Sequence, residues 1–364
     1  MLKQLTVSMS LLLPSIAIAA LPIDKISLPD GFEITTYAAN VPNARQMALG
    51  DKGTLFVGSR KAGKVHALID SNNDYQADAM FEVASDLFLP SGITFHQGDL
   101  YVAEVDKIWR YPNIEANLPK IPEPELVYDK LPNKSHHGWK FIRFGPDGLL
   151  YIPIGAPCNV CETDAPFASI IKLNVDTKQV TTVAAGVRNS VGFDFHPLTG
   201  DLWFTDNGRD MMGDDLPDDE LNHVSKEGQH FGFPYIHNAD ILDPEFGNKA
   251  SSISNQAPAL KLGAHVAALG MEFYQGKQFP NSYQNNIFIA QHGSWNRSSK
   301  VGYRIVNVKL DGNQVASAEV FASGWLQGEQ SWGRPAAVLT LKDGSLLISD
   351  DAANAIYRIS YSAK

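Results

Sequence analysis

The stretch Gly200-Asp-Leu-Trp-Phe-Thr-Asp206 is one of six copies of a short phrase, a turn residue followed by an apolar run. The other copies are GTLFVGS from Gly53, GDLYVAE from Gly98, GLLYIPI from Gly148, NNIFIAQ from Asn285 and GSLLISD from Gly344. Glycine tolerates the positive φ of a tight turn, and Leu, Phe, Val, Ile and Tyr favour β-strands. Each copy therefore predicts a turn that leads into a strand.

The spacing of the copies indicates how these strands are organised. Their starts lie 45, 50, 52, 85 and 59 residues apart, close to the length of one propeller blade except at the fourth gap. A blade cannot bury its own faces, so six blades must close into a ring around a channel. We therefore expect an all-β, single-domain, six-bladed β-propeller over residues 20–364. Its chemistry would lie in the polar residues just past the repeated strands.

Other features of the chain place the individual blades. We expect the segment 21–50 to pair with a C-terminal strand at 355–360 and to close the ring. Blades one and two extend to about residue 112, and the Pro-rich stretch 112–132 is interpreted as a surface connector because strand patterning resumes after it. Blades three and four extend to about residue 233, and blade five follows His265.

The N-terminus has the pattern of a secretory signal. Lys3 precedes an apolar stretch at residues 5–18, and Ala17-Ile-Ala19 matches a cleavage site. An uncleaved membrane anchor is the alternative, but the stretch is short and contains Pro14. We expect a signal peptide at residues 1–19, a periplasmic or secreted protein, and no membrane span in the mature chain.

The charge balance limits the partners. A formal net charge of −10 argues against nucleic acid and anionic membrane surfaces. Part of the acidic charge is clustered and could serve cation binding; the cluster comprises Asp214, Asp215, Asp218, Asp219 and Glu220.

The two cysteines stand in Cys158-Asn-Val-Cys161, followed by Glu162. In an oxidising compartment they can form a small disulfide ring, whereas free or redox-active thiols are the alternative. Two thiols do not specify a zinc site, and covalent haem would need a histidine where Glu162 stands.

Two histidine and arginine clusters could carry chemistry before the third and fourth copies of the phrase. His136-His137-Gly138 offers a general base with a pKa near working pH, or a pair of histidines that bind loop backbone. Arg188-Asn189 offers a fork for a carboxylate and an amide that both donates and accepts, or a structural arginine.

Two further clusters follow the fourth and fifth copies. The carboxylate-rich stretch from Thr205 to Asn222 favours a hard cation such as Ca²⁺, or is a solvated acidic loop. The stretches 291–297 and 331–335 place tryptophan beside arginine, which suits a flat, anionic, aromatic ligand, although Trp295 and Trp332 could be core residues. His265 is another channel candidate.

An ordered set of motifs across the mature chain resembles the soluble quinoprotein sugar dehydrogenases, and more closely their sorbosone dehydrogenase-like branch. The motifs are HHGWKFIRFGPDGLLYIPIGAPCNVCE, GVRNSVGFDFHPLTGDLWFTDNGRD, DDELNHV, HFGFPY, HVAALG, HGSWNR and WGRP. The resemblance implies a six-bladed propeller that binds pyrroloquinoline quinone (PQQ) and Ca²⁺ in its channel. It also implies oxidation of sugars or sugar-derived alcohols, with electrons passed to an external acceptor.

The resemblance also assigns roles to residues. His137 matches the family's catalytic base, which takes the substrate hydroxyl proton while hydride passes to the quinone, and Arg188 is the second catalytic residue. The residues that would bind the cofactor are Arg188, Asn189, His292, Arg297, Trp332 and Arg334. Those that would bind the metal are Gly208, Arg209 and Glu220.

Several departures from the family pattern concern the substrate. Arg209 replaces a proline, and His136 replaces an acidic residue before the base. Where glucose-oxidising members place glutamines, this chain has Pro90-Ser91 and the Cys158–Cys161 loop. These departures leave the sugar unassigned. Two other classes are weighed against the quinoprotein: a Ca²⁺-dependent lactonase on a similar propeller, and a non-catalytic propeller that binds carbohydrate or protein.

Overall fold

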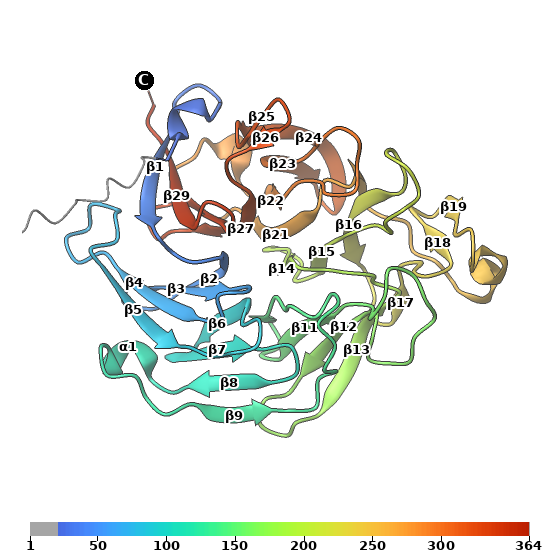
Figure 1. Ribbon diagram of the computed structural model, residues 1–364, viewed down its shortest axis with the longest axis horizontal. Helices are drawn as coiled ribbons and strands as arrows, with labels where there is room; N and C mark the ends of the chain where they lie inside the picture. The colour runs from blue at the N-terminus through green and yellow to red at the C-terminus, as the bar shows by residue number, and fades with distance from the viewer. Residues whose placement is uncertain (1–20, 364) are drawn as a thin grey trace, which may run out of the picture.

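The computed structural model describes residues 21–363, and within them six sheets are arranged as a ring around a central channel (Figure 1). This confirms the predicted six-bladed β-propeller. The predicted signal peptide at residues 1–19 lies outside the described residues. No helix among residues 21–363 has the length and apolarity that crossing a membrane requires.

Each blade is an antiparallel sheet of four strands, numbered here from the channel outward. The strands of the first three blades are β2 Ala44–Leu49, β3 Leu55–Ser59, β4 Val65–Ile69, β5 Ala79–Ala84; β6 Gly92–His96, β7 Asp99–Ala103, β8 Ile108–Tyr111, β9 Glu125–Tyr128; and β10 Arg143–Phe144, β11 Leu150–Ile154, β12 Ser169–Leu173, β13 Val180–Ala185. Those of the last three are β14 Phe193–Phe195, β15 Leu202–Asp206, β16 Asp218–Val224, β20 Leu260–Ala264; β21 Ala268–Phe273, β22 Ile287–Gln291, β23 Arg304–Asp311, β24 Gln314–Ser323; and β27 Pro335–Thr340, β28 Leu346–Asp350, β29 Ala355–Tyr361, β1 Phe32–Ala39.

The six copies of the repeated phrase form the second strand of each blade. Their turn residues all have positive φ, from 60° at Asn285 to 98° at Gly53. In β15 every residue is buried, because Trp203 packs into the interface with blade five and Phe204 into the interface with blade three. Successive strand residues point to opposite faces, so an uninterrupted apolar run indicates a strand that is covered on both sides.

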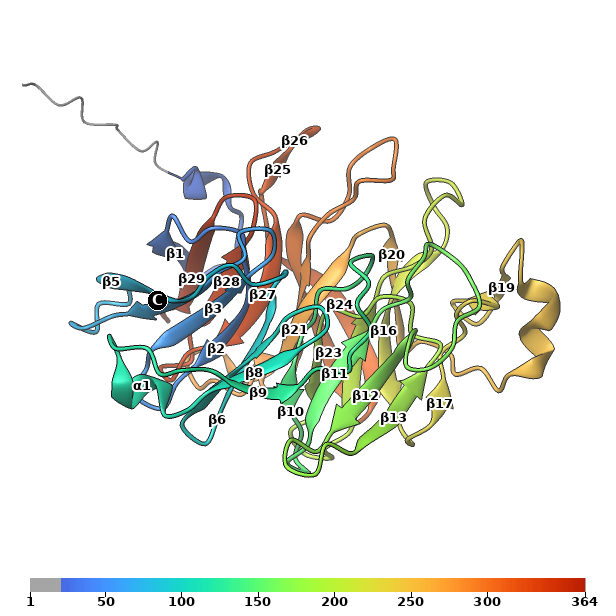
Figure 2. The ribbon, with the colours of Figure 1, turned by 60° about the horizontal axis from the view of Figure 1, so that its bottom comes forward.

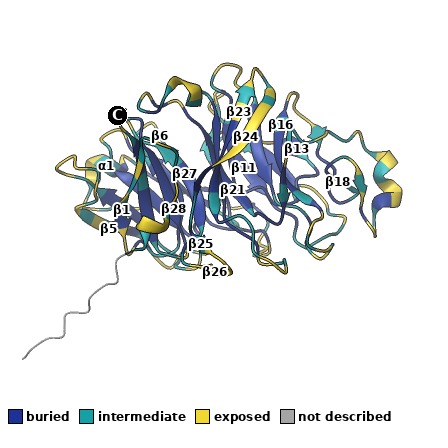
Figure 3. Cartoon of the chain, turned by 90° about the horizontal axis from the view of Figure 1, so that it is seen from above, coloured by how far each residue is buried: buried dark blue, intermediate teal, exposed yellow. Residues whose placement is uncertain are grey.

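Six apolar clusters fill the interfaces between neighbouring blades, one at each interface. The blade strands are accordingly mostly buried (Figure 3). The cluster between blades five and six contains the largest buried aromatic side chains, including Tyr274, Phe288, Trp325 and Tyr357. The hydrophobic effect thus acts mainly between blades rather than within them.

The ring is closed by the pairing of β1 with β29. Phe32 pairs with Tyr361, and the ladder continues to Ala39 and Ala355. The expected pairing of the entering segment with the C-terminal strand is confirmed, although that segment also supplies β2, the channel strand of blade one. Blade six therefore combines strands from both ends of the chain.

Two expected boundaries are wrong. The stretch 112–132 is not only a connector, because it contains the short helix α1 (Ile114–Asn117) and β9, the outer strand of blade two. Blade four does not end near residue 233, because its outer strand β20 follows a long excursion. That excursion adds β17 (Gln229–His230) to blade three as a parallel strand and then projects from the ring as the hairpin β18 (Ile236–His237) and β19 (Ile241–Leu242) (Figure 2).

The minor elements lie outside the six blade sheets. They are the 3₁₀ helices η1 Ile23–Lys25, η2 Gly247–Ser252 and η3 Asn281–Tyr283, and the hairpin of β25 Leu326–Gln327 with β26 Gln330–Ser331.

Ring closure predicts a large stability effect at Ile359. This residue is fully buried in β29, where it pairs with Ile34 of β1 and Leu346 of β28. Ile359→Ala should lower the free energy of unfolding by about 2–5 kcal/mol, since it leaves a cavity at the closure. Leu198→Ala is the control; this side chain is 78% exposed, and its loss should change stability by less than about 0.5 kcal/mol. Equal urea-unfolding midpoints for the two variants would contradict the role of the closure.

Candidate functional site

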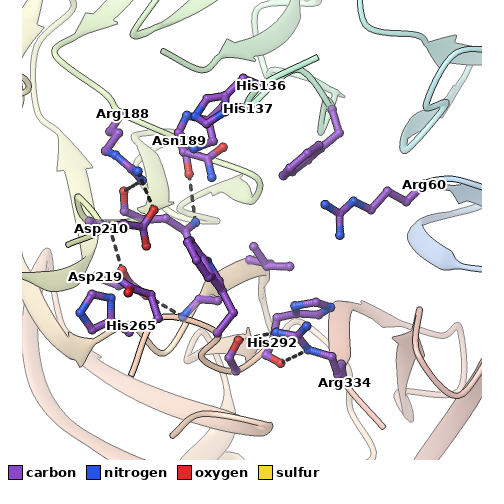
Figure 4. Close-up of a pocket in the computed structure, with 18 of the residues that line it drawn as sticks. Arg60, His136, His137, Arg188, Asn189, Asp210, Asp219, His265, His292 and Arg334 are labelled. Atoms are coloured by element: carbon purple, nitrogen blue, oxygen red, sulfur yellow. Dashed lines mark hydrogen bonds and ion pairs between the residues drawn. The ribbon is translucent and has the colours of Figure 1, made fainter. Parts of the chain in front are cut away.

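A cavity of about 300 Å³ lies at one end of the channel (Figure 4). In an antiparallel sheet, the start of the channel strand and the end of the second strand lie at the same edge. The cavity is built from these two positions in several blades. Its polar and aromatic lining consists of Arg45, Arg60, His136, His137, Trp139, Arg188, Asn189, Asn207, Asp210, Asp219, His265, His292, Trp295, Asn296 and Arg334.

The opposite end of the channel holds a second cavity, of about 350 Å³, with different chemistry. Its only arginine among the described residues, Arg143, forms ion pairs with Asp194 and Glu272. Its charges are therefore largely satisfied internally, and the arginine-rich cavity is the stronger candidate for ligand binding.

His137 is positioned as an acceptor in the cavity wall. Its Nδ1 lies 2.9 Å from the Ala156 carbonyl oxygen, which can only accept, so Nδ1 carries the hydrogen and the neutral ring leaves Nε2 free. Burial, together with the charge of Arg188 and the neighbouring His136, lowers the pKa of His137 to about 2. The imidazole is therefore neutral at working pH.

Arg188 and Asn189 are held by a carboxylate at the end of β15. Both backbone N–H groups donate to Asp206, at 2.8 and 2.6 Å. The guanidinium of Arg188 forms an ion pair with Asp210 at 3.0 Å. The side chain of Asn189 lines the cavity, and its buried Oδ1 makes no hydrogen bond within residues 21–363. An unpartnered buried acceptor of this kind is expected where a ligand binds.

A hydrogen-bonded network joins blades one, five and six on the other side of the cavity. Asp351 accepts from Arg45 Nη1 at 3.0 Å and from His292 Nε2 at 2.7 Å. Burial lowers the pKa of His292 to about 4. Burial alone would raise the pKa of Asp351, but the charges of His292 and Arg45 hold it well below its usual range.

Arg60 and Arg334 carry charge that the described residues do not neutralise by an ion pair. Arg334 donates to the carbonyl oxygens of His292 and Gly293. The guanidinium of Arg60 lies 4.3 Å from the ring centroid of Trp139, a cation–π contact. Together with Arg45 and Arg188, these arginines outnumber the two aspartates in the lining, Asp210 and Asp219. The cavity therefore attracts an anion.

The residues predicted to bind metal line a small adjoining cavity of about 20 Å³. Gly208 borders both cavities, whereas the Arg209 guanidinium turns away to pair with Asp243 and Glu245. The Glu220 carboxylate is buried and accepts from Asn222 and Asn238. No three His, Cys, Asp or Glu side chains are grouped to hold a metal ion anywhere in residues 21–363.

Two residues predicted to bind the cofactor lie outside the cavity. Arg297 donates to the Asp214 carbonyl oxygen and pairs with Asp215 at 3.0 Å in a neighbouring groove. Trp332 packs against Trp325 and Tyr357, as a core tryptophan does. By contrast, Trp295 lies at the cavity and is 68% exposed.

Cys158 and Cys161 form a disulfide, which confirms the expected pairing.

Several residues of the cavity lining, and Asp351 of the network that supports it, were missed in the sequence. Arg60 and Asp351 directly follow the first and sixth copies of the repeated phrase, the same position that singled out His292 after the fifth. Applying that rule to all six copies would have found them. Trp139 directly follows the His136-His137-Gly138 cluster, so its place beside those histidines was a signal that could have been used, whereas Arg45 lies in a segment without a distinctive motif.

The fold and the cavity define a class: six-bladed propellers with an anion-attracting site at one end of the channel. The chain matches the TrAA12-like family over residues 26–362, and it belongs to that family. A protein of Borreliella burgdorferi is 36% identical over 366 residues, covering 96% of this chain and 95% of its own.

Solved structures with low sequence identity share the fold. The Trichoderma reesei Carbohydrate-Active Enzymes Family AA12 protein has a TM-score of 0.81 at 18% identity, covering 95% of this chain and 100% of its own. The PQQ domain of pyranose dehydrogenase from Coprinopsis cinerea, in its holo form, has a TM-score of 0.77 at 17% identity, covering 92% and 97%. The soluble aldose sugar dehydrogenase of Escherichia coli has a TM-score of 0.66 at 16% identity, covering 91% and 100%. The resemblance to quinoprotein sugar dehydrogenases is confirmed for the family, whereas the sorbosone branch stays a prediction.

The lowered pKa of His137 predicts an acid-dependent stability difference. The unfolded chain takes up a proton at this imidazole below about pH 6.5, and the folded protein does not until about pH 2. Stability contributed at this site is therefore lost as the pH falls from 6.5 toward 4. Relative to His137→Asn, the wild type should lose up to about 3 kcal/mol between pH 7 and pH 4. Other titrating groups are common to both proteins and cancel; a pH-independent difference in urea-unfolding free energy would contradict the prediction.

Proposed function

We propose that this protein is a PQQ- and Ca²⁺-dependent dehydrogenase that oxidises a sugar or a sugar-derived alcohol or aldehyde. The observation that carries the proposal is the combination of four arginines and a neutral, hydrogen-bonded His137 around one cavity. Membership of the TrAA12-like family and the names of the structural neighbours support the same class.

The lining fits a flat tricarboxylate. Arg60 and Arg334 can each pair with a carboxylate, since neither has an ion-pair partner among the described residues. Asn189 offers its unpartnered Oδ1 to a donor, and Trp139 and Trp295 offer aromatic faces. His292, fixed by Asp351, completes this wall. We therefore assign PQQ binding to the arginines, Asn189 and His292, and not to Arg297 or Trp332.

A hard cation would be held mainly by the backbone. The carbonyl oxygens of Gly208 and Arg209 accept no hydrogen bond within residues 21–363, and such oxygens are suitable Ca²⁺ ligands. Glu220 lies in the adjoining small cavity with its carboxylate already occupied, so it supports the loop rather than the ion.

His137 is assigned as the general base. Its free Nε2 can accept the proton of a substrate hydroxyl, while the Ala156 carbonyl holds the ring in the required tautomer. PQQ, when bound, supplies the acceptor for the hydride and its two electrons. Burial, and after it the positive charge of Arg188, lowers the pKa of His137, so the imidazole is unprotonated in the free protein.

The cellular location and the substrate type are inferred from the sequence. A periplasmic or secreted location is inferred from the N-terminal signal, and sorbosone-type substrates are inferred from the motifs. The electrons would leave to an external acceptor. A lactonase would instead need carboxylate and Asn side chains that converge on one ion, and the arginine-rich lining does not favour that arrangement.

Reconstitution tests the proposed function directly. Purified protein mixed with PQQ and Ca²⁺ should reduce an artificial dye acceptor when supplied with an aldose, sorbosone or a polyol. Chelation with EDTA before PQQ addition should abolish the activity. If a full sugar panel gives no dye reduction and no PQQ absorbance stays with the protein after gel filtration, the proposal is wrong.

The role of His137 predicts a selective loss of turnover. His137→Ala should lower kcat by about 10²–10⁴-fold, the usual contribution of general base catalysis, while PQQ remains bound. Absorbance of the bound cofactor provides the check on binding. Turnover within about threefold of the wild type would remove His137 from this role.

Arginine placement predicts a contrast between Arg334, which lines the cavity, and Arg297, which does not. Arg334→Ala should weaken PQQ binding by about 10–100-fold, because a charge-assisted bond contributes about 1.5–3 kcal/mol. Arg297→Ala is the matched control and should leave affinity within about twofold, since Arg297 points into another groove. Fluorescence titration of the cavity tryptophans measures both, and the reverse order of effects would contradict the assignment.

A further inference from the structure

The Cys158–Cys161 disulfide closes a small ring in the loop between β11 and β12, and this loop borders the cavity-lining residues. Cys158 and Val160 pack against the buried residues Ala156, Ala168 and Phe233. The ring is therefore anchored on one side by apolar contacts. Its remaining residue, Asn159, points the other way, toward Arg188.

Asn159 holds the Arg188 guanidinium at two points. Arg188 Nε donates to the Asn159 carbonyl oxygen at 2.9 Å, and Nη2 donates to Asn159 Oδ1 at 2.8 Å. A guanidinium has five N–H groups. With the further bonds to Asp210 and to the Asn207 carbonyl oxygen, four of the five are used. One N–H of Nη1 is left for a ligand.

The same asparagine also holds the backbone of Asp210, the residue whose carboxylate pairs with Arg188. Asn159 Oδ1 accepts from the Asp210 backbone N–H at 2.9 Å, and Asn159 Nδ2 donates to the Asp210 carbonyl oxygen at 3.0 Å. Asn159, Arg188 and Asp210 thus form a closed cluster from three loops. Only 4% of the Arg188 side chain is exposed, so few other groups can orient it.

The loop joins Arg188 to the proposed base as well. The Ala156 backbone N–H donates to the Arg188 carbonyl oxygen at 2.8 Å, and the Ala156 carbonyl oxygen accepts from His137. Ala156 is two residues before Cys158. One short segment therefore sets the backbone of Arg188, its guanidinium and the ring of His137.

We propose that Asn159, held in place by the Cys158–Cys161 ring, is a positioning residue that orients the Arg188 guanidinium toward the cofactor cavity. The disulfide matters because the four-residue ring that it closes restricts the backbone of Asn159, and the carbonyl oxygen of Asn159 accepts a hydrogen bond from Arg188. Its consequence for cofactor affinity rests on the proposed function. Opening the ring or truncating Asn159 frees the guanidinium and weakens PQQ binding.

Two variants test the inference in different ways. Asn159→Ala keeps the disulfide and the carbonyl contact but removes the side-chain contacts, and Cys158→Ser/Cys161→Ser opens the ring but keeps Asn159. Asn174→Ala is the matched control, because Asn174 binds the backbone of a turn in the same blade, between β12 and β13. The measurements are made under conditions in which circular dichroism shows that the wild type and the three variants are folded.

The first readout is the affinity for PQQ in the presence of Ca²⁺, measured by tryptophan fluorescence. Both test variants should raise Kd at least tenfold, and excess PQQ should recover turnover, whereas Asn174→Ala should stay within twofold of the wild type. A merely structural loop would lower the melting temperature and leave Kd unchanged. That result would overturn the inference.

The second readout needs no cofactor. In the apo protein, the Arg188 Nε–H signal, assigned by its loss in Arg188→Gln, should exchange with solvent at least tenfold faster in Cys158→Ser/Cys161→Ser than in the wild type, because opening the ring releases the Asn159 carbonyl oxygen that accepts from Nε. In Asn159→Ala, which keeps that carbonyl contact, the Arg188 Nη2 hydrogens that donate to Asn159 Oδ1 should exchange faster instead. Unchanged exchange would overturn the positioning role. If the wild type binds no PQQ at all, the proposed function fails, and this measurement still decides whether Asn159 orients Arg188.

Discussion

The pairing of β1 with β29 joins the two ends of the chain in one blade, and the closure of the ring depends on it. Each blade presents two apolar faces, and each face is covered only by its neighbour in the ring. An open ring would expose the two end faces to water. Closure also sets the channel strands at fixed distances from one another, which places side chains from different blades in one cavity. The site is therefore a product of the same constraint that stabilises the fold.

The electrostatics of the cavity follow from this convergence. Carboxylates bind the backbone of the arginine-bearing segments. Asp206 accepts hydrogen bonds from the backbone N–H groups of Arg188 and Asn189, and Asp350 accepts one from the backbone N–H of Arg334. Both aspartates end the second strand of their blade, so the repeat supplies the same support twice. The guanidinium groups are left to face the cavity or its rim. An anionic aromatic ligand would therefore bind to guanidinium groups that are already oriented, and binding would require little reorganisation of the protein.

The fold could be predicted from the sequence because its signal is local and repeated. The six copies of the repeated phrase indicated the number of blades. His292 directly follows the fifth copy, and His137, Arg188 and Arg334 lie in the segments that lead into the third, fourth and sixth copies. Errors arose where a strand lacked the pattern. The outer strands β9 and β20 are short and follow long irregular stretches, and outer strands carry less of the apolar pattern than strands covered on both faces. Arg297 and Trp332 lie outside the cavity for a related reason: proximity along the chain says nothing about which side of a loop a side chain leaves.

By itself, the sequence determined the number of blades, the strand that each phrase forms, and the edge of the ring at which polar residues gather. Only the tertiary structure decided which of those residues share a cavity. Arg45 and Asp351 are 306 residues apart and meet because the ring closes. The direction of a side chain and the partner that satisfies it depend on neighbours from other blades, as Asn159 and Arg188 show. Packing and the free-energy cost of leaving a buried polar group unpaired determine these side-chain directions and hydrogen-bond partners. A local sequence pattern indicates neither of them.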